Sequence, residues 1–232
     1  MTSTSYDNIN RKLARQLISG QNLTLIHVRY CPFCIKTDLA AGYLNINKEN
    51  IACGDSTVTV PLIGKHQVPI LKKADSAMAE SDDICEYLHE LSEKRLFLDR
   101  EHWSANDLET VLNILGQIRS LSLTKIRSYM LEHPVHSKDF CTEEARNIYK
   151  SRYPTNSPET FDDKMVQQLF YQLDPLFVGK TECTVSQFSR HDTMIFSRLR
   201  TLMILHQVDI LAGPSTVEFY KKISDLGEVP SY

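Results

Sequence analysis

Residues 23–34 of this chain read LTLIHVRYCPFC, and this stretch predicts the start of an α/β domain. The segment 23–28 is short and rich in β-formers, which favours a buried strand. Pro32 has no backbone N–H to lose and a fixed φ that suits the first turn of a helix. A helix is therefore expected to begin directly after Cys31, with Cys34 about one turn inside it.

Strands and helices are expected to alternate up to about residue 97. The sequence predicts strands at 50–53, 67–71 and 77–79, and helices from Pro32 to about Gly42 and from Ser81 to Leu91. Pro69 falls inside the strand expected at 67–71. Such alternation within so few residues is typical of a small α/β domain.

The second half of the chain lacks strand signals and is expected to be all-helical. Apolar stripes at helical spacing run from Leu108 to Ile118, through Phe161, Met165, Leu169 and Leu173, from Ile195 to His206, and from Val217 to Ile223. Residues 154–158 and Asp174-Pro175 carry loop signals. The expected organisation is an N-terminal helical extension (1–21), an α/β domain (22–97), a linker (98–107) and an all-helical domain (108–232).

The composition narrows the classes of function. A formal net charge of −3 and a pI of about 6.2 argue against general nucleic-acid binding, because phosphate binding needs a basic surface. No stretch approaches the ~20 consecutive apolar residues of a membrane span, so no membrane partner is expected. The six cysteines are too scattered for a disulfide scaffold and suit a reducing compartment, so a cytoplasmic protein is expected.

The Cys-Pro-Phe-Cys sequence at residues 31–34 has a specific chemical meaning at the start of a helix. A thiol in this position faces unsatisfied backbone N–H groups and the positive end of the helix dipole. Both favour the thiolate, so the pKa of Cys31 is expected to fall and its sulfur to become nucleophilic. Cys34 is close enough to attack a mixed disulfide formed on Cys31. Phe33 is expected to border the opening.

Two other interpretations of this cysteine pair remain open at this point. The pair could be half of a zinc site, but structural zinc normally takes four Cys or His ligands and no second Cys-x-x-Cys is present. The pair could also be unreactive core thiols. We favour the redox interpretation and expect no metal. For Cys85, which follows Ile84 on a helix with a buried face, a packed thiol is expected.

Val68-Pro69 gives an independent signal. A proline in a strand removes a hydrogen-bond donor from the ladder, so its presence needs a reason. In thioredoxin-like folds the reason is a cis peptide beside the reactive cysteines, which leaves the backbone of the preceding residue free to pair with a bound thiol peptide. The alternative is a trans proline on an edge strand.

Residues 80–83, Glu-Ser-Asp-Asp, precede a helical run. Ser81 is a natural N-cap and the acidic residues suit a first turn, and capping alone can account for them. The functional interpretation is that the Ser81 hydroxyl and the first N–H groups of the helix hold a carboxylate, while Glu80 or an Asp holds the adjacent ammonium. The γ-glutamyl end of glutathione carries that pair of charges.

Taken together, the segments 30–34, 67–71 and 80–84 resemble the two-domain bacterial glutaredoxin 2 family, which has a glutathione-transferase-like fold. The resemblance is specific over about 23–97. Beyond it, the best match is Ser189-Arg190-His191-Asp192, a capping box of the kind that starts a buried core helix in the transferase superfamily. The resemblance implies an α/β thioredoxin-like N-terminal domain packed on an all-α C-terminal domain, with glutathione in the cleft between them.

The resemblance also implies roles for individual residues. Cys31 would be the attacking thiolate and Cys34 the second, resolving cysteine. Val68 would pair its backbone with glutathione beside cis-Pro69. The remaining glutathione-binding residues would be Tyr30, Phe33, Glu80 and Ser81.

The implied activity is glutathione-dependent reduction of glutathionylated mixed disulfides and protein disulfides, with glutathione as co-substrate and disulfide-containing proteins as partners. A glutathione transferase or a dehydroascorbate-reductase-like enzyme is the alternative, and Cys34 speaks against it because a transferase has no use for a second cysteine. A redox-sensing binding protein or a bridging iron–sulfur cluster ranks lower.

Three departures from the family pattern affect substrate choice. About 20 extra residues precede the first strand, Phe33 stands where members often have Tyr, and the segment 49–61 matches poorly.

Overall fold

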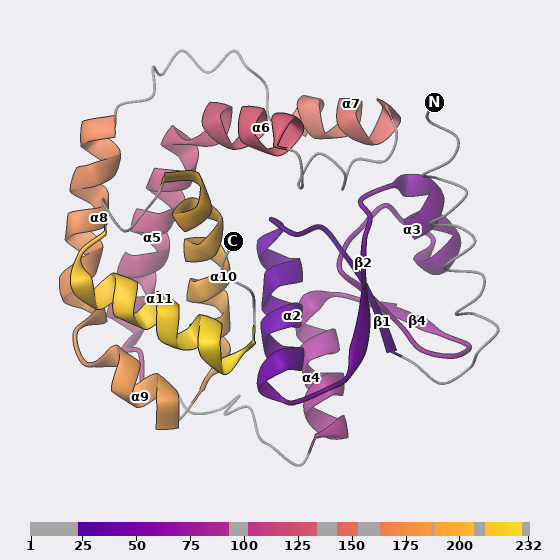
Figure 1. Cartoon of the computed structure of the whole chain (residues 1–232), viewed down its shortest axis with the longest axis horizontal. Coiled ribbons are helices and arrows are strands. Elements are labelled where there is room, and N and C mark those ends of the chain that lie inside the picture. The colour runs from indigo at the N-terminus through magenta and orange to yellow at the C-terminus, as the bar shows by residue number, and fades with distance from the viewer. Residues whose placement is uncertain are drawn as a thin grey trace.

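The computed structural model describes residues 23–92, 102–133, 143–152, 163–186, 188–206 and 212–228. The expected extension at 1–21, the loop at 154–158, Phe161 and residues 98–101 of the expected linker lie outside these ranges. The described chain forms a domain with a mixed sheet beside a helical domain (Figure 1). The expected two-part architecture is thus confirmed.

Four strands form the sheet of the first domain: β1 (Leu23–His27), β2 (Lys48–Ala52), β3 (Ile70–Lys72) and β4 (Ala77–Ala79). Their spatial order is β2-β1-β3-β4. The central strand β1 pairs parallel with β2 and antiparallel with β3, and β3 pairs antiparallel with β4. Three residues, 28–30, connect the carboxyl end of β1 to Cys31, so the cysteine pair follows the central strand of the sheet.

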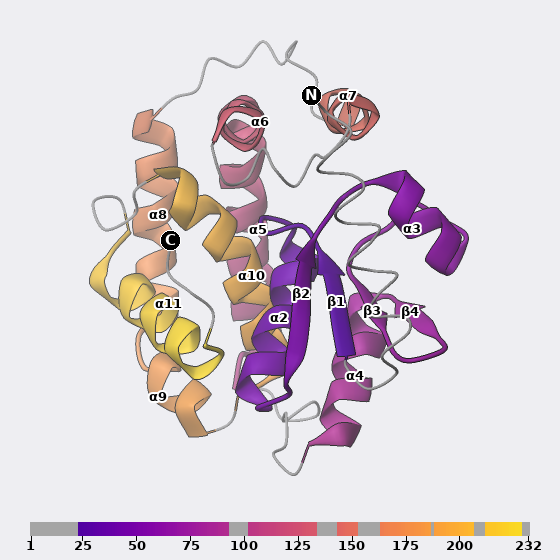
Figure 2. The same cartoon turned by 45° about the vertical axis from the view of Figure 1, so that its right-hand side comes forward.

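Helices cover both faces of this sheet (Figure 2). Helices α2 (Pro32–Tyr43) and α4 (Ser81–Leu91) lie on one face, where Leu39, Leu71 and Ile84 share a core with the helical domain. On the other face, α3 (Ser56–Ile63) closes a separate small core that includes Ile26 and Val58. One face of the sheet is thus tied to the second domain.

The structure differs from the sequence prediction in the segment between β2 and β3. Helix α3 was not predicted, because its sequence STVTVPLI is rich in β-branched residues and contains Pro61. Its ends explain why it forms: the Asp55 carboxylate accepts a hydrogen bond from Thr57 N at 2.8 Å, and Gly64 ends the helix at a φ of 75°. Pro69 lies directly before β3 and not inside a strand, which corrects the expectation for 67–71.

Seven helices of the second domain are described: α5 (Ala105–Leu121), α6 (Leu123–Glu132), α7 (Glu143–Arg152), α8 (Asp163–Phe177), α9 (Lys180–Ser186), α10 (Arg190–His206) and α11 (Pro214–Leu226). Four of them contain the apolar stripes. The short helices α6, α7 and α9 were not predicted, although α6 carries Leu123, Ile126 and Met130 at helical spacing. None of the described helices is both long and apolar enough to cross a membrane.

Three details of this domain correct the sequence prediction. Helix α5 begins at Ala105, so the last three residues of the expected linker are helical. Asp174-Pro175 is not a loop but lies inside α8, where the Asp174 carboxylate accepts a hydrogen bond from Thr216 N at 2.8 Å and so caps α11. Met165 is 47% exposed, because the neighbouring Val166 takes the buried position in its turn of α8.

The capping box before α10 is present, as expected. The carboxylate of Asp192 accepts hydrogen bonds from Ser189 N and Ser189 Oγ, each at 2.8 Å. Its other oxygen accepts from Trp103 Nε1 at 2.9 Å and from Thr184 Oγ1 at 3.0 Å. Asp192 is fully buried, so this network fixes the start of the helix that packs against α2.

Candidate active site at the start of helix α2

Cys31 occupies the N-cap position of α2, directly before Pro32 at the start of the helix. Its backbone N–H donates to the Val28 carbonyl oxygen at 3.1 Å, which fixes the turn between β1 and α2. Cys31 as a whole residue is partly exposed. The strand-to-helix junction expected from the sequence is therefore present, with the thiol at the open end of the helix.

The surroundings of Cys31 lower the pKa of its thiol to about 7. The largest cause is a hydrogen bond from the Cys34 thiol; burial opposes it, and the backbone N–H groups of Cys34 and Phe33 and the positive charge of Arg119 add to it. The expected fall in pKa is confirmed, but the neighbouring thiol contributes more than the helix start. About half of Cys31 is thiolate near neutral pH.

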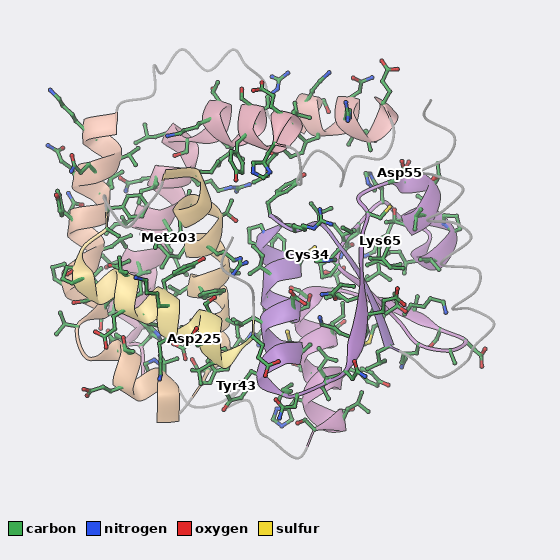
Figure 3. The ribbon with its side chains drawn as sticks, in the orientation of Figure 1. Cys34, Tyr43, Asp55, Lys65, Met203 and Asp225 are labelled. Atoms are coloured by element: carbon green, nitrogen blue, oxygen red, sulfur yellow. The ribbon has the colours of Figure 1, made fainter. Side chains whose placement is uncertain are left out.

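Cys34 lies inside the first turn of α2 and has no exposed surface. Figure 3 labels it at the end of the helix that meets the sheet. The Val28 N–H donates to Cys34 Sγ at 3.4 Å. The two residues therefore differ in burial: Cys31 is partly exposed, and Cys34 is buried.

Tyr30, the residue before Cys31, is held by the helical domain. The hydroxyl of Thr201 on α10 donates to the Tyr30 carbonyl oxygen at 3.1 Å, and the Tyr149 ring on α7 meets the Tyr30 ring edge-on at 5.5 Å. Cys31 and Val68 both pack against the same apolar cluster, which includes residues of α6 and α7. The site thus lies where the two domains meet.

Val68 and Pro69 are joined by a cis peptide bond, as expected from the sequence. Val68 and Cys31 pack against one apolar cluster, so the cis peptide and Cys31 border the same part of the core. The Phe33 side chain is 61% exposed, in keeping with a residue at an opening.

The start of α4 differs from the expectation in one respect. Glu80, with a φ of 71°, is the N-cap residue, and Ser81 is the first residue of the helix and is buried. The exposed Glu80 carboxylate accepts from Lys65 Nζ at 2.8 Å, and hydrogen bonds from Lys65 and Gln67 lower its pKa. Because Gln67 precedes Val68, Glu80 lies on the cis-peptide side of the site.

Asp82 joins the two domains instead of facing the site. It forms an ion pair with Lys36 of α2 and another with Arg190 of α10, the second at 2.7 Å. Although burial opposes ionisation, these two cations lower the pKa of the Asp82 carboxyl group. Asp82 was one of the acidic residues expected to hold the ammonium group of a ligand. Its carboxylate is instead paired with Lys36 and Arg190.

Cys53 and Cys85, the other two cysteines whose side chains the structure describes, are buried thiols. Burial raises the pKa of Cys85 to about 12, which confirms the expected packed thiol, and Cys53 has no exposed surface. Cys31, Cys34, Cys53 and Cys85 are thiols that form no disulfide in this structure. Within the described ranges, no three His, Cys, Asp or Glu side chains are grouped to hold a metal ion. Cys141 lies outside those ranges.

Several residues around the site were missed by sequence reasoning. Thr201, Tyr149 and Arg119 come from the helical domain, up to 171 positions from the residue they approach. Arg119 stands in the last turn of α5, where a basic residue is already explained by the helix dipole. Only Lys65, two residues before Gln67, lay near a recognised motif.

Comparison with known proteins agrees with this geometry. Residues 25–95 match the family described as glutathione S-transferase, N-terminal domain. Glutaredoxin 2 of Escherichia coli strain K12 is 26% identical over 203 residues, which cover 83% of this chain and 89% of that protein.

Two solved structures share the fold. Glutaredoxin 2 from Salmonella typhimurium, in complex with glutathione, superposes with a TM-score of 0.71 at 23% identity, over 90% of this chain and 96% of that one. The trimeric glutathione transferase TDR1 of Leishmania gives 0.52 at 17% identity, over 88% of this chain and 43% of that one. This chain is thus a two-domain protein of glutathione-transferase-like fold that is similar to glutaredoxin 2 over most of its length.

Proposed function

We propose that this chain is a glutathione-dependent thiol–disulfide oxidoreductase with Cys31 as its nucleophile. The observation that carries the proposal is that Cys31 is a partly exposed residue whose thiol pKa of about 7 depends first on a hydrogen bond from Cys34. A thiolate at neutral pH with a second thiol in contact is the arrangement that dithiol exchange requires. The similarity to glutaredoxin 2 supports the same activity.

Glutathione would bind to residues of the first domain, on the side of the site formed by the cis peptide and the start of α4. The backbone of Val68, beside cis-Pro69, pairs with the peptide backbone of glutathione as a strand edge would. Ser81 and the first N–H groups of α4 hold the γ-glutamyl carboxylate, and Glu80 holds its ammonium group. Glu80 shares its carboxylate between this ammonium and Lys65. Tyr30 and Phe33 border the bound thiol.

A glutathionylated substrate would be reduced in two displacements. The Cys31 thiolate attacks the glutathione sulfur, the substrate's S–S bond breaks, and the substrate leaves as a thiolate that takes up a proton. A second glutathione, as thiolate, attacks the same glutathione sulfur and releases oxidised glutathione. Cys31 returns as a thiolate, whose low pKa makes it a good leaving group.

A protein disulfide would need Cys34 as well. Cys31 attacks one sulfur of the substrate and forms a mixed disulfide. Cys34, which already contacts the Cys31 sulfur, loses its proton and attacks Cys31, so that the reduced protein leaves and a Cys31–Cys34 disulfide remains. Two glutathiones then reduce this bond and become one oxidised glutathione. A reducing cytoplasm, where free thiols persist, is the compartment we propose for this cycle.

Glutathione transfer to an electrophile is the second candidate, because residues 25–95 match a transferase domain. In that reaction glutathione itself is the nucleophile, and neither cysteine of the pair would be needed. The requirement for Cys31 therefore separates the two candidates.

The test is glutathione-dependent removal of glutathione from a mixed-disulfide peptide by the wild type, Cys31→Ser, Cys34→Ser and the control Cys85→Ala. We expect Cys31→Ser to lose at least 10³-fold in kcat/KM, as removal of a nucleophile does. Cys34→Ser and Cys85→Ala keep activity on this substrate. Equal activity of Cys31→Ser and wild type would overturn the proposal.

A further inference from the structure

One carboxylate connects three helices around the proposed glutathione site. Asp82, in the first turn of α4, forms an ion pair with Lys36 of α2 and a second one, at 2.7 Å, with Arg190, the first residue of α10. The same oxygen, Asp82 Oδ1, takes part in both pairs. Helix α2 packs against both α4 and α10 (Figure 2). Asp82 therefore links the two helices that carry the proposed site to each other and to the helical domain.

Lys36 is an unusual residue for its position on α2. Its side chain is only 8% exposed, and its ammonium group donates a hydrogen bond to Asp82. The residues on either side of it, Ile35 and Thr37, are buried as well. Replacing a buried ion pair by apolar side chains of similar size is often neutral or stabilising, because burial of the charges costs free energy. The stability of the fold alone does not explain a lysine here.

An ion pair provides something that apolar packing does not, namely a fixed distance. Apolar attraction is non-directional, so two helices that touch only through apolar side chains can slide or rotate slightly against each other. A charge-assisted hydrogen bond instead prefers a donor–acceptor separation of about 2.7–2.9 Å and a narrow range of angles. Buried polar pairs are best known as devices that fix the register between helices. The pair between Lys36 and Asp82 can fix the register of α4 on α2.

The two ends of this link lie next to the groups that would bind and attack glutathione. Asp82 directly follows Ser81, where the γ-glutamyl carboxylate would bind. Lys36 is two residues after Cys34 on the helix whose N-cap is Cys31. A glutathione half whose γ-glutamyl end is held at Ser81 must place its sulfur at Cys31. The register of the two helix starts thus decides how well one glutathione satisfies both contacts.

We propose that Asp82 is a positioning residue for glutathione: through Lys36 and Arg190 it holds the start of α4 at the distance from Cys31 that a glutathione bound at both ends requires. This inference rests on the proposed function and adds to it the means by which mixed disulfides of γ-glutamyl thiols are selected. A disulfide half without the γ-glutamyl group gains nothing from the fixed spacing. Asp82 acts through the position of α4 and takes no part in the exchange of thiols.

The test compares two mixed disulfides of one peptide. One contains glutathione and the other cysteinylglycine, which is glutathione without its γ-glutamyl residue. Glutathione reduces both, and each kcat/KM is divided by the uncatalysed rate constant of the same disulfide, which removes differences in intrinsic reactivity. The quotient of the two normalised values is the γ-glutamyl preference. We expect a preference of about 100-fold for the wild type, because the missing group makes two charge-assisted contacts.

Lys36→Met is the most informative variant. Methionine fills a similar space without a charge, and Asp82 keeps its pair with Arg190, so the denaturant midpoint should be unchanged or higher. The γ-glutamyl preference should nevertheless fall about tenfold, because α4 is no longer held in register with α2. The fall should come from the glutathione disulfide, while the cysteinylglycine disulfide is reduced as by the wild type. A lysine that served stability alone would leave the preference unchanged.

Asp82→Asn breaks the link from its other end. It leaves Lys36 buried without a carboxylate, so both the preference and the denaturant midpoint should fall. Arg190→Gln should lower the preference only about two- to threefold, because this pair is about half exposed, and Arg190→Lys should restore it. The controls Glu86→Gln on α4 and Lys222→Met on α11 each remove one charge from an exposed position and should leave the preference unchanged.

Iodoacetamide labelling of Cys31 separates an effect on position from an effect on the nucleophile. Lys36→Met should be labelled at about the wild-type rate, and a loss of labelling that parallels the loss of preference overturns the positioning role. An unchanged preference in Lys36→Met, or an active wild type without any preference, also overturns that role and leaves the oxidoreductase standing. A wild type that reduces neither disulfide overturns the proposed function, and with it the role of Asp82.

Discussion

The starts of α2 and α4 place two cysteines on the same face of the sheet with opposite chemical results. Burial raises the pKa of both Cys31 and Cys85. At Cys31, hydrogen bonds from Cys34 and from two backbone N–H groups outweigh burial, and the pKa falls to about 7. Cys85 lies one turn inside α4, where only the charges of Lys36 and Arg190 oppose burial, and its pKa rises to about 12. Donors at the helix start, and not exposure alone, make a thiol reactive.

The largest difference between the two thiols should be seen in alkylation. At pH 7 about half of Cys31 but only about one part in 10⁵ of Cys85 is thiolate, given pKa values of about 7 and about 12. Iodoacetamide should therefore label Cys31 at least ~10⁴-fold faster, with a rate that rises with pH and reaches half its maximum near pH 7. A midpoint near 9, or parallel labelling of both residues, would contradict the comparison.

Cys85→Ser tests whether Cys85 is a structural thiol, through its effect on the stability of the fold. A hydroxyl placed in the apolar contacts of Cys85 lacks the hydrogen bonds that it would have in water, so the free energy of unfolding should fall by about 1–3 kcal/mol. Denaturant unfolding measures the change, with Cys85→Ala as the matched variant that adds no polar group. Disulfide reduction by the folded variant should be unchanged, and a loss of activity comparable to that of Cys31→Ser would refute the assignment of Cys85 as structural.

Cys34→Ala sharpens the comparison by removing the largest of the stabilising groups at Cys31. We expect the Cys31 pKa to rise by about one unit, toward the value of an ordinary thiol, with about tenfold less thiolate below neutral pH. The pH profile of iodoacetamide labelling gives this shift. Because the resolving thiol is also lost, reduction of protein disulfides should stop while mixed disulfides are still reduced. An unchanged labelling profile would show that Cys34 does not stabilise the thiolate.

Arg119→Gln should have the smallest effect, because the charge of Arg119 lowers the Cys31 pKa less than the hydrogen bonds do and is exposed to solvent. The Cys31 pKa should rise by a few tenths of a unit, about a twofold change in thiolate below pH 7. The shift should shrink in high salt, whereas that of Cys34→Ala should not. A salt-independent shift would point to a structural change instead of a lost charge.

The half of the site on the first domain could be predicted because its chemistry is local in sequence. A strand, a helix-starting proline and two cysteines lie within residues 23–34, and cis-Pro69 and Glu80 stand in short motifs of their own. Helix α3 of the first domain was not predicted, because its β-branched residues oppose helix formation. The caps Asp55 and Gly64 at its two ends are what allow it to form.

The half on the second domain could not be predicted, because it depends on how α10 and α7 pack. Nothing in the sequence around Thr201 or Tyr149 indicates that they meet Tyr30, since hydroxyl and aromatic residues are ordinary on helices. Asp174-Pro175 gave a misleading loop signal for the same reason: the carboxylate caps a different helix, 42 positions away. Local patterns point to Cys31 as the proposed nucleophile, and tertiary packing decides its neighbours.

The hydrogen bond from Thr201 to Tyr30 ties the main chain next to Cys31 to a helix of the second domain. A slight change in the tilt of α10 displaces the Tyr30 carbonyl, and through it the thiol that follows. Substitutions deep in the helical half can therefore alter reaction rates without touching a substrate. For the same reason, the first domain expressed alone would lack the contacts that α10 makes beside Cys31, so the proposed activity should require both domains in one chain.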